Sequence, residues 1–297
     1  MLVRTDLALE RREITGYGEI DGVEMEKEET GNVTVTRIKV VNNNGEIAIE
    51  KPCGAYVTLE VPPFSNDAEL FDGRIDVLAK EIRTMLPENL NGGVLVAGLG
   101  NRKITPDALG PEVVSLIFTT RHIQGEIARS VGLSGLNSVC AVATGVLGET
   151  GMETFEVVRG LVDSIKPSAV IAVDALASYS VSRLGCTVQI SDSGIFPGSG
   201  VGNKRCELSC KTLDIPVVSI GVPTVVDAAT LVCSLLRAGD DCDKIINTIE
   251  PDGKRMMVTP KEIDLITHRA AKYIAMGINC ALNPVIPAKD ILSLVAD

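Results

Sequence analysis

The chain has 297 residues, of which 45% are hydrophobic, so it can bury a large core. Its net charge of −11 and its 3% aromatic content, with no Trp, argue against nucleic acid as a direct partner, because nucleic acids bind clustered cations and stacking rings. No uncharged apolar run reaches the roughly 18 residues that a membrane span needs, and the eight cysteines lack C-x-x-C spacing. We therefore expect a globular cytoplasmic protein with reduced thiols and with no membrane or nucleic-acid partner.

The first 62 residues differ in pattern from the rest of the chain. The acidic stretch 21–29 reads as a loop, and the alternation of apolar and polar residues over 32–41 predicts a strand. The stretches 45–50 and 55–61 repeat this alternation, so we expect two further strands there. Residues 1–62 are therefore predicted to form a small β-rich N-terminal region.

From residue 63 onward, helical and strand patterns alternate. We predict helices from Asn66 to 86, from the end of the Asp107 turn to about 130, up to 165, over 225–238, over 260–275 and from 290. Strands are predicted at 93–98, 137–142, 169–173, 185–190 and 215–220. A turn is predicted at 221–224. This alternation predicts an α/β fold, a three-layer α/β/α arrangement around a mostly parallel central sheet, continuous with the N-terminal region.

Two aspartates follow predicted strands. Asp107 lies in the turn after strand 93–98, and Asp174 directly follows strand 169–173. Because ligands bind at the carboxyl ends of strands in open α/β sheets, we expect both carboxyls to face one crevice. Two close carboxyls do not ionise together easily, so one would donate a proton while the ionised one activates water. The alternative is that each aspartate caps a helix.

Other candidate motifs are weaker. The stretch Gly98-Leu99-Gly100 has Lys103 where a dinucleotide fingerprint requires its third glycine. Both histidines, His122 and His268, fall inside predicted helices, away from the crevice. This argues against a nucleophile that is activated by histidine.

The Gly- and Ser-rich stretch 191–205 is a candidate wall of the cleft, where its backbone N–H groups would serve a substrate or an oxyanion. The alternative is a flexible surface loop. The candidate cleft residues are Ser193, Gly194, Gly198, Ser199, Gly200, Lys204 and Arg205.

Eight stretches carry a further signal: Val3–Ala8, Gly98–Asn101, Thr105–Pro111, Asp174–Ala177, Ser191–Ile195, Pro197–Arg205, Ser219–Ala228 and Met257–Glu262. Together they resemble the germination protease family of spore-forming bacteria, and the likeness runs from the first residues to about residue 283. The resemblance implies an endopeptidase that degrades small acid-soluble spore proteins in the spore core during germination. It further implies a homotetramer that is made as a self-processing zymogen.

The same resemblance implies which residues act. The family's two essential aspartates fall on Asp107 and Asp174. Its cleavage pattern, an acid followed by an apolar residue and Ala, fits Asp6-Leu7-Ala8, so the processed bond is expected between Asp6 and Leu7. This divides the chain into a pro-segment (1–6), the β-rich region (7–62) and a peptidase region (63–297). Because the body of the protein is acidic, Arg4 of the pro-segment is expected to pair with a carboxylate.

One departure from the family concerns Phe196, where some relatives have His. Hydrogenase-maturation peptidases, which share the expected fold, bind nickel through two acids and a His. With Phe at position 196, two carboxylates would hold a transition metal poorly, so we predict no metal and no other cofactor. The alternatives are a metallopeptidase that uses the same two acids and a non-catalytic binding protein.

Overall fold

The computed structural model describes residues 4–16, 18–66, 69, 72–123, 130, 135–198, 205–236, 248 and 256–295. The strands are β1 (Val23–Thr30), β2 (Val33–Val40), β3 (Gly54–Glu60), β4 (Val94–Leu99), β5 (Val139–Gly145), β6 (Ala169–Ser178), β7 (Thr187–Ser191), β8 (Val217–Asp227) and β9 (Met257–Val258). The helices are α1 (Ala8–Thr15), α2 (Asn43–Ile49), α3 (Arg74–Met85), η1 (Thr105–Asp107), α4 (Leu109–Ser115), α6 (Leu147–Thr150), α7 (Thr154–Ile165), η2 (Val181–Arg183), α8 (Cys210–Leu213), α9 (Ala228–Leu236), α11 (Ile263–Leu282) and α12 (Ala288–Val295).

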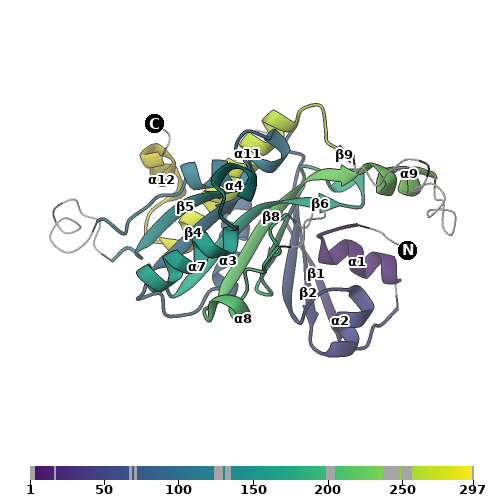
Figure 1. Ribbon diagram of the computed structural model, residues 1–297, viewed down its shortest axis with the longest axis horizontal. Coiled ribbons are helices and arrows are strands. Elements are labelled where there is room, and N and C mark those ends of the chain that lie inside the picture. The colour runs from purple at the N-terminus through teal and green to yellow at the C-terminus, as the bar shows by residue number, and fades with distance from the viewer. Residues whose placement is uncertain are drawn as a thin grey trace.

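The described strands form one sheet in the order β1-β2-β3-β7-β8-β6-β4-β5, with β9 paired to β8 (Figure 1). Strands β5, β4, β6 and β8 are mutually parallel, as expected where helices connect successive strands. Strands β1, β2, β3 and β7 continue the same sheet in antiparallel pairing up to β8. The β-rich N-terminal region and the parallel strands thus share one sheet.

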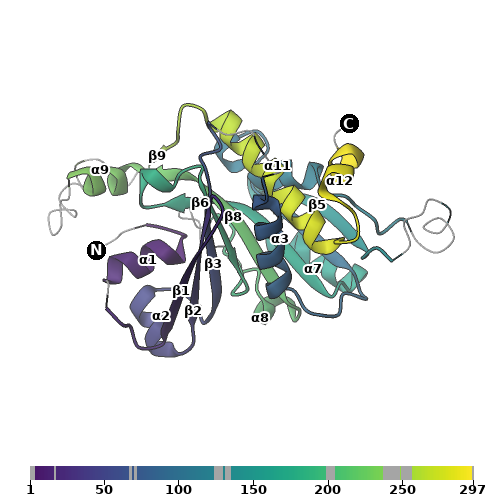
Figure 2. The same ribbon diagram turned by 180° about the vertical axis from the view of Figure 1, so that it is seen from behind.

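Helices cover both faces of this sheet. Because side chains alternate along a strand, Val94 and Val96 of β4 pack into the core beneath α3, α4 and α11. Leu95 and Ala97 point the other way, into a second core that α7 covers. Figures 1 and 2 show α7 on one face of the sheet and α3, α11 and α12 on the other. The predicted α/β fold, with helices on both sides of a central sheet, is confirmed.

Two predictions for the N-terminal region are wrong. The acidic stretch 21–29 is largely strand β1, an edge strand whose residues are almost all exposed, so the apolar alternation that marks most strands is missing. The stretch 45–50 is largely helix α2. The side chain of Asn42 accepts a hydrogen bond from Gly45 N–H at 3.0 Å, which makes Asn42 the N-cap of this helix.

Two helix boundaries also differ from prediction. The helix expected from Asn66 begins at Arg74, after Gly73 in a left-handed conformation. The helix after Asp107 ends at Ser115, far short of residue 130. It stops there because Asn279 of α11 hydrogen-bonds both Leu116 C=O and Phe118 N–H, which satisfies the backbone beyond the helix end.

Strands β6 and β8 both run further than predicted. Asp174 pairs with Gly221, and Leu176 pairs with Pro223, so the predicted end at residue 173 and the predicted turn at 221–224 are both strand. Asp174 therefore lies inside a strand. Its place on the sheet follows from the period-2 alternation, which puts it on the face of Leu176.

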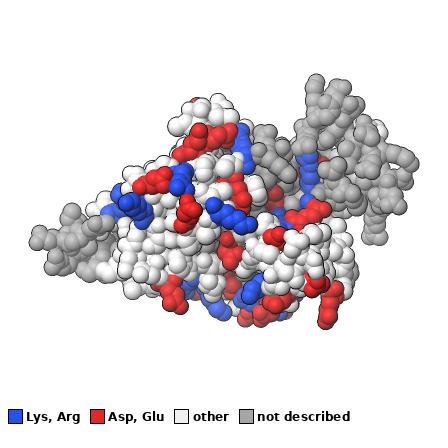
Figure 3. All heavy atoms as spheres, turned by 60° about the horizontal axis from the view of Figure 1, so that its bottom comes forward, with Lys and Arg blue, Asp and Glu red and all other residues white. Residues whose placement is uncertain are grey.

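On the face shown in Figure 3, acidic and basic side chains of the described residues are intermixed. No helix of the part that the structure describes is long and apolar enough to cross a membrane.

Candidate active site

The turn after β4 places the Asp107 carboxyl. Gly100 adopts φ +103°, and a Cβ there would lie 2.1 Å from the carbonyl oxygen of Asp107, so only glycine fits. One Asp107 carboxylate oxygen, Oδ2, accepts a hydrogen bond from Asn101 N–H at 2.7 Å. Burial raises the pKa of Asp107 above 3.8, the Asn101 N–H lowers it, and the charge of Glu149 adds to the rise.

Asp174 is buried in β6, the strand next to β4. Its carboxyl accepts a hydrogen bond from Ala175 N–H at 2.9 Å and another from the Gly198 backbone. Burial raises the pKa of Asp174 well above 3.8, and the negative charge of Asp107 is the second cause. The structure thus brings the two aspartates close enough to interact, and the interaction favours a protonated Asp174 beside an ionised Asp107.

Neither aspartate caps a helix. Helix α4 has no side-chain cap, and the Asp107 carboxyl instead receives Asn101 N–H. Asp174 lies within a strand. The capping alternative is therefore wrong for both residues.

A cavity of about 430 Å³ opens on the same face of the sheet as Asp174. Its walls come from β6, β7 and β8, from the stretch that follows β7, and from residues of α1, β3 and the segment after α2. Ser193 and Gly194, two of the predicted cleft residues, line this cavity, and so do Leu176 and Phe196.

The remaining predicted cleft residues have separate outcomes. Gly198 lies at the Asp174 carboxyl. Arg205 is not among the residues that line the cavity, and its guanidinium pairs with Glu153 at 3.1 Å. The other predicted cleft residues, Ser199, Gly200 and Lys204, lie outside the described residues.

Asp6 is among the residues that line this cavity, whereas Asp107 and Asp174 are not. Asp6 N–H donates to Ala177 C=O at 2.9 Å, and Ala177 N–H donates to the Asp6 carboxylate at 2.8 Å. The charge of Asp6 also raises the pKa of Asp174. Leu7 is fully buried in the apolar core that contains Leu176. The predicted processing site therefore lies along the strand that carries Asp174.

Sequence reasoning missed two residues that touch this segment. Lys51 Nζ donates to the carbonyl oxygen of Asp6 at 2.7 Å, and Gln189 Nε2 donates to the same oxygen at 3.0 Å. A glutamine between Val188 and Ile190, in a strand with one apolar face, was a usable signal for Gln189. Nothing in the local sequence distinguishes Lys51.

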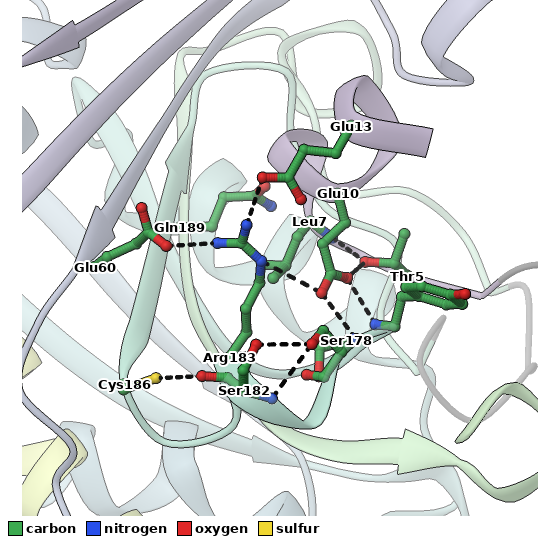
Figure 4. A network of polar contacts seen from close by, with 12 residues as sticks. Thr5, Leu7, Glu10, Glu13, Glu60, Ser178, Ser182, Arg183, Cys186 and Gln189 are labelled. Atoms are coloured by element: carbon green, nitrogen blue, oxygen red, sulfur yellow. Dashed lines mark hydrogen bonds and ion pairs between the residues drawn. The ribbon is translucent and has the colours of Figure 1, made fainter. Parts of the chain in front are cut away.

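A buried polar network fastens the residues on both sides of the Asp6–Leu7 bond (Figure 4). Glu10 accepts hydrogen bonds from the Thr5 hydroxyl, from Tyr179 N–H at 2.6 Å and from Ser180 N–H at 2.9 Å, and it pairs with Arg183 at 3.5 Å. Burial is the largest influence on Glu10 and raises its pKa, while these partners lower it. The network ties α1 to the end of β6.

The predicted ion pair of Arg4 is confirmed. Arg4 Nη1 lies 3.7 Å from Asp227 Oδ2, and the Asp227 side chain is only 6% exposed. Asp227 also accepts a hydrogen bond from Thr230 N–H at 2.9 Å. Arg4 thus connects the segment before Asp6 to the end of β8.

Both histidines lie on the surface. His122 is in a turn rather than a helix, and the His268 side chain on α11 is 68% exposed. Within the residues that the structure describes, no group of three or more His, Cys, Asp or Glu side chains is arranged to hold a metal ion.

Comparison with known proteins gives the family. A family model described as germination protease matches residues 4–237. The chain is 40% identical to a germination protease of Clostridium tetani, with 99% of each chain covered, and 41% identical to one of Clostridium acetobutylicum, with 97% of this chain and 98% of that protein covered. A [NiFe] hydrogenase maturation protease from Thermococcus kodakarensis matches with 17% identity and a TM-score of 0.36, covering 67% of this chain and 98% of its own. The chain belongs to the germination protease family.

Proposed function

We propose that this germination-family peptidase is made as a zymogen that hydrolyses its own Asp6–Leu7 bond with Asp107 and Asp174 as the catalytic pair. In its mature form it degrades small acid-soluble spore proteins in the spore core. Family membership supports the peptidase activity. The aspartic mechanism and the zymogen processing are our inference from the site.

The charge state of the two carboxyls supports a water-activating mechanism. The ionised Asp107 carboxylate takes a proton from water, which adds to the carbonyl carbon of Asp6. The Asp174 pKa lies well above 3.8, so its carboxyl keeps a proton that it can donate. One acid and one base that act together are what hydrolysis of an amide requires.

One observation carries the proposal: Asp6, which lines the cavity, is held along β6, the strand that carries Asp174. Asp6 pairs with Ala177, three positions after Asp174, and its charge affects the pKa of Asp174. Leu7 fills an apolar site, which agrees with the expected preference for an apolar residue after the cut. A substrate protein would take the same path once residues 1–6 have left.

The test is self-cleavage of the full chain, followed by intact-mass spectrometry. The wild type is expected to lose residues 1–6, whereas Asp107→Asn and Asp174→Asn should remain folded and uncut. Asp163→Asn, a change at an exposed aspartate of α7, is the matched control and should process normally. Normal cleavage in either Asp107→Asn or Asp174→Asn contradicts the proposal.

The domain division and the assembly are part of the same proposal. Residues 1–6 are the pro-segment, 7–62 the β-rich region and 63–297 the peptidase region. The mature enzyme is a homotetramer, as the family resemblance implies. Light scattering after size-exclusion chromatography tests this assembly, and a mass of about 31.4 kDa per particle would contradict it.

A further inference from the structure

Two side-chain donors converge on a single backbone oxygen, the carbonyl oxygen of Asp6. Lys51 reaches it from the segment after α2, with Nζ at 2.7 Å. Gln189 reaches it from the middle of β7, with Nε2 at 3.0 Å. These distances are those of good hydrogen bonds, and two donors use both lone pairs of the oxygen.

Gln189 also fixes the chain on the other side of the Asp6–Leu7 bond. Its Oε1 accepts a hydrogen bond from Ala8 N–H at 2.6 Å while its Nε2 donates to Asp6. One carboxamide therefore spans the two peptide groups on either side of Leu7. Since Gln189 is only 8% exposed and its strand neighbours face the opposite core, its rotamer is held by packing as well as by these bonds.

Lys51 is half-buried and lines the cavity, so its ammonium group has lost part of its water. This loss of solvent lowers its pKa, and the charge of Arg11 lowers it further, while Asp6, Glu10 and Glu50 raise it. A hydrogen-bond donor in a partly desolvated site interacts more strongly with a negative oxygen than the same donor in water does.

We propose that Lys51 and Gln189 form the oxyanion site of this peptidase, binding the scissile carbonyl oxygen of Asp6 and stabilising the negative charge that develops on it. The inference rests on the proposed function, because it requires the Asp6–Leu7 bond to be the one that is cut. It assigns catalytic roles to two residues besides the aspartate pair.

The reaction balances without a further co-reactant. Water adds to the carbonyl carbon of Asp6 and gives one proton to the Asp107 carboxylate, while the C=O π electrons move onto the oxygen that Lys51 and Gln189 hold. When this oxyanion collapses, the C–N bond breaks and the Leu7 nitrogen takes a proton from a carboxyl of the pair. The products are a new carboxyl group on Asp6 and a free amine on Leu7.

Loss of one oxyanion donor typically slows the chemical step by about 100- to 1,000-fold. We therefore expect Lys51→Met to reduce the first-order rate of self-cleavage of the full chain by about that factor, with Lys51→Arg recovering part of the loss. Gln189→Met should slow the reaction to a similar extent. Lys39→Met, at an exposed lysine of β2, is the matched control and should cleave at the wild-type rate.

Hydrogen exchange at residues 5–8 distinguishes a catalytic role of Lys51 and Gln189 from a role in anchoring the segment. Asp6 keeps its two hydrogen bonds to Ala177 in Lys51→Met, one from its N–H and one to its carboxylate, so the segment should exchange as slowly as in the wild type while cleavage is lost. Exchange that rises in proportion to the lost rate would overturn the proposal, and so would Lys51→Met cleaving within about threefold of the wild type. Thermal melting identifies any variant that fails to fold. If Gln189→Met is lost in this way, the rate of self-cleavage of Lys51→Met alone decides the test.

The two proposals fail in different ways. A wild-type chain that does not cut between Asp6 and Leu7, or an Asp174→Asn variant that does, overturns both proposals. Cleavage that depends on Asp174 but is unaffected by Lys51→Met overturns only the oxyanion site.

Discussion

The turn at Gly100 allows a direct test of how tightly Asp107 must be placed. In Gly100→Ala, the new Cβ would lie 2.1 Å from the Asp107 carbonyl oxygen and 3.1 Å from its Oδ1. Side chains do not tolerate contacts under 3.0 Å, so the Asp107 backbone has to move by about 0.9 Å. The positive φ of +103° adds strain of about 1–2 kcal/mol for a residue with a Cβ.

The expected cost is large for activity and moderate for stability. A displacement of about 1 Å at a catalytic group lowers rates by roughly 100-fold, which is about 2.7 kcal/mol of activation free energy. Strain and overpacking together should lower the free energy of unfolding by about 2–4 kcal/mol.

The assay is the time course of self-cleavage by intact mass, under conditions in which denaturant titration finds the variant folded. Gly160→Ala in α7 is the control, because its Cβ meets nothing within 4 Å and a helical alanine should stabilise by up to about 1 kcal/mol. If folded Gly100→Ala cleaves within about threefold of the wild type, the argument that this turn positions a catalytic Asp107 is refuted.

Three further predictions concern the cleft. Asp174→Asn should have a higher melting temperature than the wild type at pH 8 but not near pH 3. The folded-state pKa of Asp174 is raised above 3.8, so the stability that its protonated carboxyl contributes is fully present below pH 3.8 and is lost as pH rises through the folded-state pKa. Equal melting temperatures at both pH values would contradict the assigned burial cost. Leu7→Ala should lower the free energy of unfolding by about 2–5 kcal/mol in urea titrations, since Leu7 is fully buried. Leu294→Ala, at an exposed position, should change it by less than about 0.5 kcal/mol. Similar values for the two variants would refute the docking of Leu7. Arg4→Ala should cost about 1 kcal/mol and speed hydrogen exchange at residues 5–8, because it removes the cation beside buried Asp227; unchanged exchange would mean that Arg4 does not hold the segment.

The proposed site combines features that stabilise the segment with features that cost stability. Thr5 and Glu10 fasten the chain on either side of the Asp6–Leu7 bond, since Thr5 donates to Glu10 and Glu10 accepts hydrogen bonds from the two residues that follow β6. Asp174 and Asp107 do the opposite, since burial penalises the ionised form of each and the charge of Asp107 penalises that of Asp174 further. Functional sites commonly carry such a penalty, which surrounding packing offsets.

The sequence by itself determined the α/β class, because segments with the hydrophobic period of a helix and segments with that of a strand alternate along the chain, and this can be read without the tertiary structure. It also singled out Asp107 and Asp174, since an acid that follows a run of apolar strand residues is visible in the local pattern. Prediction from the local pattern failed for β1, which has no apolar face. It also failed for the end of β6, because pairing with β8 extends that strand beyond Val173.

Only the tertiary structure decided how Asp6 meets the rest of the molecule. Lys51 and Gln189 are separated by more than a hundred positions, and they come together at one carbonyl oxygen because β3 pairs with β7. The raised pKa of Asp174 likewise depends on burial and on charges from Asp107 and Asp6, neither of them a neighbour in the chain. Side-chain period and capping act over a few residues, whereas desolvation and convergent hydrogen bonds arise only once the sheet is assembled.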